Sequence, residues 1–262
     1  MLVDARTTTM PHRTALDLTG RVALVTGASR GLGLAIADKL SRSGCEVLLN
    51  YVRDDASAQR AVRGLTGERA ALRLVRADVG RPDEVRRLLA DVENRHGRLD
   101  IFVHNASVFH PTPTADPDAD ACAAEHRVAV GPLLYGAGHL TRLMRPGTGR
   151  IIAISSSGGR YVVPGYLGLG MAKAALETLV RYLAVEVAGH GITVNAVAAG
   201  KLSKDAAGAA SEAAARVVAR TPAGRLTRPG EVADVVALLC RPEAAAVHGQ
   251  VITVDGGLGL LA

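Results

Sequence analysis

The chain has very little aromatic surface: its 262 residues include two Phe, five Tyr and no Trp. Proteins that bind single-stranded nucleic acid stack the bases on aromatic side chains, and too few are present here for that mode of binding. The formal charge of +6 does not alter this expectation, because Arg alternates with Asp and Glu along stretches such as residues 83–98. Such mixed charge is typical of a solvated helix face. We therefore predict no nucleic-acid partner.

Cysteine is also scarce, and long apolar runs are absent. Cys45, Cys122 and Cys240 are far apart and form no Cys-x-x-Cys pair, which disfavours disulfides and structural zinc and indicates a reducing, cytoplasmic location. No apolar run approaches the ~18 residues that a transmembrane helix needs. Residues 1–19 lack the apolar stretch of a signal peptide. We expect no metal and no membrane partner, and we interpret residues 1–19 as a flexible N-terminal extension.

The sequence is rich in short apolar runs that alternate with helical apolar periods, a pattern typical of βαβ units and a parallel sheet. Its length suits one such domain with an ample core. We therefore predict an α/β fold: a single Rossmann-like doubly wound parallel sheet of about seven strands, with helices on both faces, over residues 20–262. Residues 201–220 have weak periodicity and are expected to form a mobile lid. The predicted strands lie at about residues 22–26, 46–51, 71–76, 101–104, 151–155, 193–197 and 251–254.

A glycine cluster follows the first predicted strand and opens a helix. The free N–H groups and the positive dipole end of such a helix favour an anion. Gly27 permits the turn, Gly31 lets the backbone approach a pyrophosphate, and Gly33 lets helix and strand pack closely. This context predicts a dinucleotide site, and the alternative is a tight turn without a ligand. The segment is Thr26-Gly27-Ala28-Ser29-Arg30-Gly31-Leu32-Gly33, and Ser29 and Leu32 are counted among its cofactor contacts.

The end of the second strand indicates which dinucleotide is bound. NAD-binding folds place an acid about 20 residues after the glycine loop, to hold the ribose 2′-hydroxyl. This chain has Arg53 there instead, and Arg30 in the glycine loop is a second base. Two guanidinium groups without a carboxylate suit a 2′-phosphate. We therefore predict NADPH as the cofactor.

Over about residues 20–262 these motifs resemble the short-chain dehydrogenase/reductase superfamily. The resemblance also rests on the serines that end the fifth predicted strand and on Lys173 in the helix that follows. It implies a reductase of small molecules that assembles as a homodimer or homotetramer. It also implies further cofactor contacts from Asp78, Val79, Asn105, Ala106, Lys173, Gly200 and Leu202.

The catalytic half departs from this family, whose members place Ser and then Tyr-x-x-x-Lys beside the nicotinamide ring. Ser156 and Lys173 match the pattern, but Leu169 stands at the tyrosine position and has no proton to give. The family's catalytic asparagine falls near Val128, so that residue is missing as well. The proton must therefore come from another group.

Tyr166 is one candidate source of the proton. It precedes Lys173 by seven residues, and Tyr-x6-Lys resembles a branch of enoyl-acyl-carrier-protein reductases. If residue 166 is helical, residues 166, 169 and 173 share a face, because four and seven steps both come near whole turns. We predict Ser156, Lys173 and Tyr166 as catalytic residues, and Ser156, Tyr161, Tyr166 and Leu169 as substrate contacts.

Three functions remain open. The first is NADPH-dependent reduction of a ketone on a polycyclic aromatic polyketide in antibiotic biosynthesis, with the proton supplied by a phenol of the substrate. The loss of Asn and Tyr beside an intact cofactor half resembles atypical ketoreductases of such pathways. The second is an enoyl-thioester (enoyl-acyl-carrier-protein) reductase that uses Tyr166. The third is an NADPH-binding pseudoenzyme or sensor, against which the intact Ser156 and Lys173 count.

Overall fold

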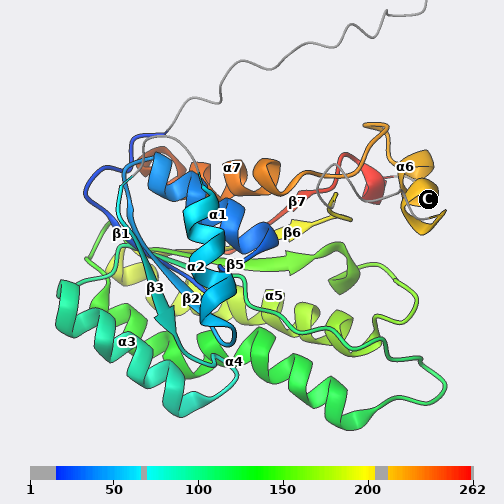
Figure 1. Cartoon of the computed structure of the whole chain (residues 1–262), viewed down its shortest axis with the longest axis horizontal. Coiled ribbons are helices and arrows are strands. Elements are labelled where there is room, and N and C mark those ends of the chain that lie inside the picture. Colours follow the sequence, from blue (N-terminus) through cyan, green and yellow to red (C-terminus); the bar gives the residue numbers. More distant parts are fainter. Residues whose placement is uncertain (1–15, 66–69, 204–211, 261–262) are drawn as a thin grey trace, which may run out of the picture.

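The computed structural model describes residues 16–65, 70–203 and 212–260 and contains one sheet of seven parallel strands (Figure 1). The strand order is β3-β2-β1-β4-β5-β6-β7. The predicted fold class is confirmed, and the strand ends differ from the prediction by no more than two residues. The strands are β1 (Val22–Val25), β2 (Glu46–Tyr51), β3 (Leu72–Arg76), β4 (Ile101–His104), β5 (Arg150–Ser156), β6 (Thr193–Ala199) and β7 (Val251–Val254).

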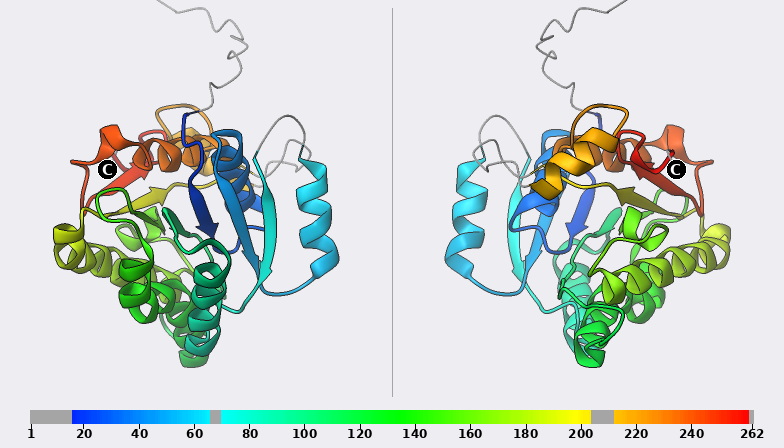
Figure 2. Two further views of the ribbon diagram at one scale, coloured as in Figure 1. Left: turned by 90° about the vertical axis from the view of Figure 1, so that its left-hand side faces the viewer. Right: turned by 90° about the vertical axis from the view of Figure 1, so that its right-hand side faces the viewer.

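Helices cover both faces of this sheet (Figure 2). Successive side chains of a strand point to opposite faces, so Leu24 of β1 joins one buried cluster and Ala23 joins the other. The first cluster includes residues of α3, α4 and α5, and the second includes residues of α1 and α7. The described helices are α1 (Gly31–Arg42), α2 (Asp55–Gly64), α3 (Pro82–His96), α4 (Ala119–Leu143), α5 (Leu167–Val187), α6 (Glu212–Arg220) and α7 (Pro229–Leu239).

The strand order reverses at β1, which pairs with β2 on one side and β4 on the other. In open parallel sheets, ligands bind in the crevice outside the carboxyl ends of the strands at such a switch point. The glycine loop follows β1, Asn105 follows β4, Ser156 ends β5 and Gly200 follows β6. The fold therefore brings the predicted cofactor and catalytic residues to one edge of the sheet.

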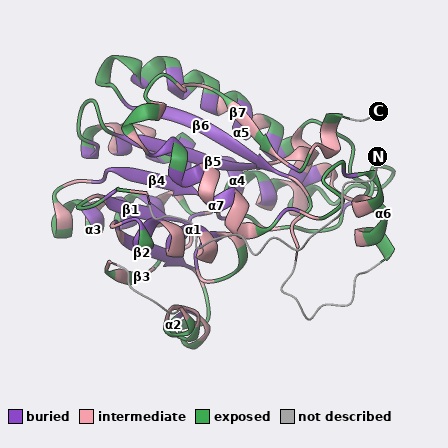
Figure 3. Cartoon of the chain, turned by 90° about the horizontal axis from the view of Figure 1, so that it is seen from above, coloured by how far each residue is buried: buried purple, intermediate pink, exposed green. Residues whose placement is uncertain are grey.

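The predicted N-terminal extension and lid are only partly covered by the description. Residues 1–15 lie outside the described residues, but Leu18 is 2% exposed and its N–H donates to the carbonyl of Ser43 at 2.7 Å. Residues 16–19, which we assigned to the extension, therefore pack on the domain. Within the expected lid, residues 204–211 are not described, and α6 contains no buried residue (Figure 3).

Candidate functional site

The three glycines of the loop after β1 have different structural roles. Gly27 has φ +61°, and a Cβ there would lie 2.9 Å from Cα of Ala106. A Cβ on Gly33 would lie 2.3 Å from the carbonyl oxygen of Gly27, so both positions exclude a side chain. Gly31 has φ +54° and no neighbouring atom within 4 Å of a Cβ, at the first residue of α1. This open backbone at a helix N-terminus fits the pyrophosphate of a dinucleotide.

Asn105 holds the glycine loop against the end of β4. Its Nδ2 donates to the carbonyl oxygens of Thr26 at 3.0 Å and Gly27 at 3.1 Å. The backbone N–H groups of Asn105 and Ala106 both donate to the hydroxyl oxygen of Thr26, each at 3.0 Å. These bonds fix the loop conformation before any cofactor binds.

His104 is a structural residue beneath this loop. It is 1% exposed, and its Nε2 lies 2.9 Å from the carbonyl oxygen of Ala129, so Nε2 must carry the proton. The other nitrogen, Nδ1, then accepts from the Thr26 hydroxyl at 3.0 Å. Burial, and secondarily the charge of Lys173, lowers the pKa of His104 to about 3. The imidazole is therefore neutral at physiological pH, with both ring nitrogens hydrogen-bonded within the protein.

The two acidic residues in the segment after β2 interact with other parts of the protein. Asp54 has φ +60° and caps α2, with its Oδ1 accepting from the N–H of Ser57 at 2.8 Å. Asp55 lies 3.8 Å from Arg76. Arg53 is exposed two residues after β2 ends, and Arg30 is exposed directly before α1. The two predicted 2′-phosphate ligands thus follow the carboxyl ends of the neighbouring strands β2 and β1.

The remaining predicted cofactor residues lie on loops at the same edge of the sheet. Asp78 accepts from the N–H of Gly80 at 2.9 Å, and Val79 beside it is 3% exposed. Gly200 donates its N–H to Val254 at 3.0 Å, and Leu202 forms an isolated bridge with Thr227. Ser29 and Leu32 are half-buried in the glycine loop.

Tyr166 lies outside the helix. It is the N-cap of α5, with φ −109° and ψ 16°, so the helical conformation on which the shared face with residues 169 and 173 depended is not adopted at residue 166. Its ring lies against Gly158, where a Cβ would be 2.5 Å from Cε1, and its centroid is 5.3 Å from that of Phe109. Burial raises the pKa of the phenol, a hydrogen bond with Ser156 opposes that rise, and the charge of Glu125 adds to it. Tyr166 is therefore a neutral phenol whose hydroxyl lies beside Ser156.

Leu169 is a core residue. It is 4% exposed and belongs to the same buried cluster as Ala129 and Leu133 of α4. Of the four predicted substrate contacts, Tyr161 lines the cavity described below, whereas Ser156, Tyr166 and Leu169 do not. The sequence position that carries the proton-donating tyrosine in the short-chain dehydrogenase/reductase family is therefore occupied here by a side chain packed between α4 and α5.

Lys173 is almost fully buried, with 4% exposure, and its Nζ donates to the carbonyl oxygen of Ile154 at 2.7 Å. Burial lowers its pKa to about 8, against the opposing effect of the Glu177 carboxylate. Glu177 in turn accepts from the Ser155 hydroxyl at 2.7 Å and from Nε of Arg160 at 3.2 Å. This network ties the second turn of α5 to the end of β5.

Glu125 was not predicted to contribute to the site. It is 0% exposed, and its Oε1 accepts from the N–H of His110 at 2.6 Å. Its Oε2 has no hydrogen-bond partner among the described residues and lies against Gly168, where a Cβ would be 2.2 Å away. Its burial was not predicted because a glutamate beside other polar residues of a helix is usually exposed to solvent. The available signal was that residue 125 continues the apolar stripe formed by Ala129 and Leu133 at helical spacing.

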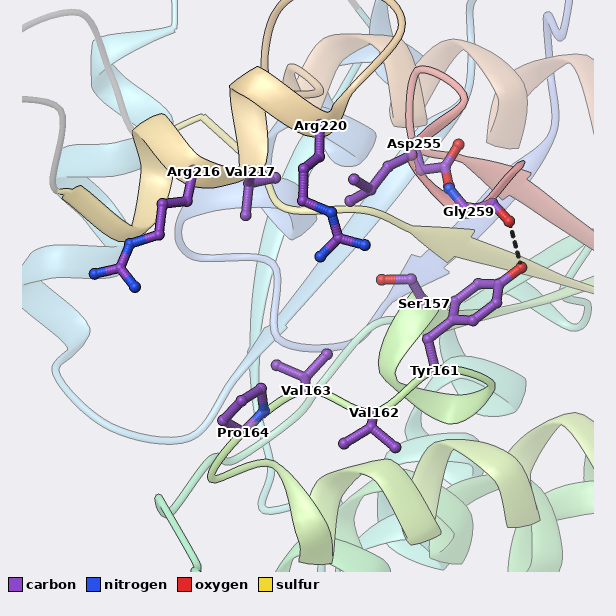
Figure 4. A pocket seen from close by; sticks show the side chains of 11 residues that line it. Ser157, Tyr161, Val162, Val163, Pro164, Arg216, Val217, Arg220, Asp255 and Gly259 are labelled. Atoms are coloured by element: carbon purple, nitrogen blue, oxygen red, sulfur yellow. Dashed lines mark hydrogen bonds between the residues drawn. The ribbon is translucent and has the colours of Figure 1, made fainter. Parts of the chain in front are cut away.

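A cavity of about 280 Å³ lies beside these residues, between the loop after β5, α6 and the segment after β7 (Figure 4). Tyr161 lines it and donates its hydroxyl to the carbonyl of Gly259 at 2.9 Å. Ser156 immediately precedes the lining residue Ser157 in sequence. The lining residues are Ser157, Tyr161, Val162, Val163, Pro164, Arg216, Val217, Arg220, Asp255, Leu258 and Gly259.

Two other kinds of site are not found in the described part of the chain. It contains no group of three or more His, Cys, Asp or Glu residues placed to hold a metal ion. None of its helices combines the length and the apolar character needed to cross a membrane.

Comparison with known proteins agrees with the geometry. The family model described as "Enoyl-(Acyl carrier protein) reductase" matches residues 27–259. A 1-cyclohexenylcarbonyl-CoA reductase from Streptomyces collinus is 36% identical over 257 residues, which cover 96% of this chain and 91% of that protein. A versicolorin reductase from Emericella nidulans is 34% identical over an alignment that covers 92% of this chain and 96% of that protein.

Solved structures give the same result. A short-chain dehydrogenase/reductase from Serratia marcescens superimposes with a TM-score of 0.85 at 30% identity, covering 92% of this chain and 98% of that one. LugOII, a promiscuous reductase that catalyses keto-reduction at C1 during lugdunomycin biosynthesis, superimposes with a TM-score of 0.83 at 33% identity, covering 93% and 99%. The nucleotide-binding edge, the buried lysine and these matches together place the chain in the short-chain dehydrogenase/reductase superfamily.

Proposed function

We propose that this protein is an NADPH-dependent reductase of a carbon–carbon double bond conjugated to a thioester carbonyl. The observation that carries the proposal is the position of Tyr166, whose ring packs against Gly158, two residues after Ser156, and whose phenol has a pKa influenced by burial and by the Ser156 hydroxyl. Leu169, at the usual tyrosine position, is packed in the core. The order of our two enzymatic predictions is thereby reversed, and the enoyl-thioester alternative becomes the first candidate.

The choice of cofactor is supported by charge. Arg30 and Arg53 follow β1 and β2 without a competing carboxylate, because Asp54 caps α2. The open backbone at Gly31 leaves room for the pyrophosphate, and by family resemblance Lys173, Asn105 and Gly200 would border the nicotinamide. When bound, the reduced cofactor supplies a hydride.

A hydride added to the β-carbon of an enoyl thioester would leave negative charge on the thioester oxygen as an enolate, and a proton delivered to the α-carbon would then complete the saturated thioester. The Tyr166 hydroxyl and the Ser156 hydroxyl are the two neutral donors placed together to stabilise that charge. Since burial keeps the phenol protonated, Tyr166 has a proton to donate at neutral pH. The buried cation of Lys173 adds favourable electrostatic potential from the second turn of α5.

The relatives support this order of candidates. The family model carries the description of an enoyl reductase, and the relative from Streptomyces collinus is named as the reductase of an unsaturated acyl-CoA. Because those names describe other proteins, the substrate of this chain must be tested directly.

The test is NADPH oxidation with crotonyl-CoA and 1-cyclohexenylcarbonyl-CoA, compared with a panel of phenolic polycyclic ketones. Loss of a general acid typically costs 10²–10⁴-fold, so Tyr166→Phe should lower kcat with the enoyl thioester by that factor. The matched control is Tyr161→Phe, because that hydroxyl is bonded to Gly259 in the cavity wall. Wild-type-like turnover of the enoyl thioester by Tyr166→Phe would exclude Tyr166 as the donor.

The second candidate is reduction of a ketone on an aromatic polyketide, with a substrate phenol as the proton donor. LugOII and the versicolorin reductase are both similar to more than nine tenths of this chain, and LugOII, which catalyses a keto-reduction, favours this candidate. In that case, methylating the phenol next to the ketone should strongly reduce turnover without preventing substrate binding. The substitution Tyr166→Phe should have only a small effect on turnover. The third candidate is an NADPH-binding pseudoenzyme or sensor. It would be favoured if the protein binds NADPH but reduces neither class of substrate.

We also propose a homodimer or homotetramer in the cytoplasm. The outer faces of α4 and α5 expose large apolar side chains, including Leu134, Tyr135, Tyr182 and Val185, of which Val185 is 81% exposed. Such side chains on neighbouring helices suit burial between subunits. The molar mass in solution, measured by light scattering, decides between a monomer and an oligomer.

A further inference from the structure

The cavity beside the catalytic residues has one wall formed by α6 (Figure 4). Two arginines of this helix line it, and they differ in their surroundings. Arg216 is paired with Glu212 at 2.7 Å and extends outwards. Arg220 extends into the cavity towards Ser157 (Figure 4). Among the residues that the structure describes, the ion pair of α6 is that of Arg216, and Arg220 takes part in none. Arg220 therefore offers a cation to whatever occupies the cavity.

The other polar groups of the wall are mostly engaged with the protein itself. The Tyr161 hydroxyl donates to Gly259. The two carboxylate oxygens of Asp255 accept from the N–H groups of Gly257 and Gly259, each at 2.8 Å, so both oxygens are bonded to the backbone of the C-terminal segment. The hydroxyl of Ser157, opposite Arg220, also faces the cavity (Figure 4).

The rest of the lining is apolar. Val162, Val163 and Pro164 form one side, and Val217 and Leu258 approach from α6 and the C-terminal segment. Pockets of this kind bind an apolar body and fix its orientation through a few polar contacts. A guanidinium group at an apolar surface selects carboxylate or phosphate, to which it donates charge-assisted hydrogen bonds.

We propose that Arg220 and the Ser157 hydroxyl form a subsite for an anionic group of the substrate, a carboxylate or a phosphate, whose apolar part lies against Val162, Val163 and Pro164. The reacting carbonyl then lies towards Ser156, the residue before Ser157. The assignment of this anion to the substrate rests on the proposed function, but the anion site itself does not.

The first experiment measures binding without turnover. 2-Naphthoate and its uncharged analogue 2-naphthamide are titrated into the NADPH-loaded protein by calorimetry. The wild type should bind 2-naphthoate at least about tenfold more tightly than 2-naphthamide, on the scale of a charge-assisted hydrogen bond. Arg220→Gln should lose about tenfold or more for 2-naphthoate while its affinity for 2-naphthamide stays the same. Arg220 is exposed, so folding should be unaffected, and thermal unfolding checks this.

Arg216→Gln is the matched control, because it removes the same charge one turn away on the same helix. It should change 2-naphthoate affinity less than threefold, by the argument that its partner is Glu212. An unchanged affinity in Arg220→Gln, or an equal loss in both variants, overturns the proposal.

The second experiment identifies the source of the anion. The CoA thioester and the phosphate-free N-acetylcysteamine thioester of crotonic acid are compared as substrates of the wild type and Arg220→Gln. A KM increase for the CoA ester alone assigns the subsite to a carrier phosphate. Unchanged KM values, together with Arg220-dependent binding of 2-naphthoate, assign it to a carboxylate on the acyl part. Arg220-dependent binding in a protein that reduces neither ester retains the subsite and removes the proposed function.

Discussion

At the scale of single residues, the site is defined by which side chain reaches Ser156. Leu169 stands where the resembling family places its tyrosine, and it is buried between α4 and α5. Tyr166 reaches Ser156 from the N-cap because Gly158 leaves space for its ring. Its surroundings are fixed by the segment after β4: Phe109 contacts the ring, and the N–H of Thr112 donates to Gly165 at 3.0 Å.

Glu125 should act as a positioning residue for Tyr166. Its carboxylate accepts from His110, in the same segment that carries Phe109 and Thr112. Glu125→Ala removes this acceptor and should lower kcat about tenfold or more while NADPH affinity stays within twofold, because a buried donor left unsatisfied costs about 1–3 kcal/mol and the segment shifts. Glu125→Gln keeps an acceptor oxygen and should restore most of the rate. Steady-state kinetics and calorimetry measure the two quantities.

The exposed residue Glu186 of α5 supplies the control, and Glu186→Ala should behave as wild type. Equal kcat values for Glu125→Ala and the wild type would show that the segment after β4 needs no anchor at residue 125.

At the scale of elements, most of the fold was predictable because its signals are local. The strands and the glycine loop are each encoded within about ten consecutive residues. The loop geometry requires glycine at 27 and 33 through contacts with Ala106 and between the two glycines. The position of Tyr166 was not predictable, since it depends on where α5 begins and on contacts with Gly158 and Phe109. The burial of Glu125 likewise depends on packing between α4 and α5.

The junction between β2 and α2 carries the cofactor prediction. Arg53 lies in this junction, and the carboxylate of the next residue, Asp54, is bonded to the N–H of Ser57 in the cap of α2. Arg53→Asp should weaken NADPH binding about tenfold or more and reverse or abolish its preference over NADH, since each charge-assisted contact contributes ~1.5–3 kcal/mol. Dissociation constants for both cofactors, measured by calorimetry, test this.

Arg63→Asp, at the exposed last turn of α2, makes the same change in net charge and should leave the preference intact. Equal affinities of the wild type for NADPH and NADH would contradict the assignment of Arg30 and Arg53 to a 2′-phosphate.

At the scale of the whole molecule, the core and the cofactor edge share one buried polar group. The imidazole of His104 ends β4, contacts the glycine loop through Thr26 and reaches α4 through Ala129. Its ring also stacks on Phe102, with centroids 6.4 Å apart. Because three elements meet at this side chain, its protonation state is coupled to folding of the whole domain.

The stability of the domain should therefore fall with acidification in a window set by His104. Its pKa is about 3 in the folded protein, lowered by burial from an ordinary 6.5. Between these values the unfolded chain binds a proton that the folded chain does not, so unfolding takes up a proton and lower pH favours unfolding. This destabilisation by His104 is absent above pH 6.5 and reaches about 2 kcal/mol at pH 5, at 1.36 kcal/mol per pH unit.

Urea unfolding at pH 7.5 and pH 5 tests this prediction. Between these two pH values, His104→Gln should lose about 2 kcal/mol less stability than the wild type. His126→Gln, at an exposed histidine of α4, should keep the wild-type pH dependence, and parallel curves for all three proteins would show that His104 is not the coupled group.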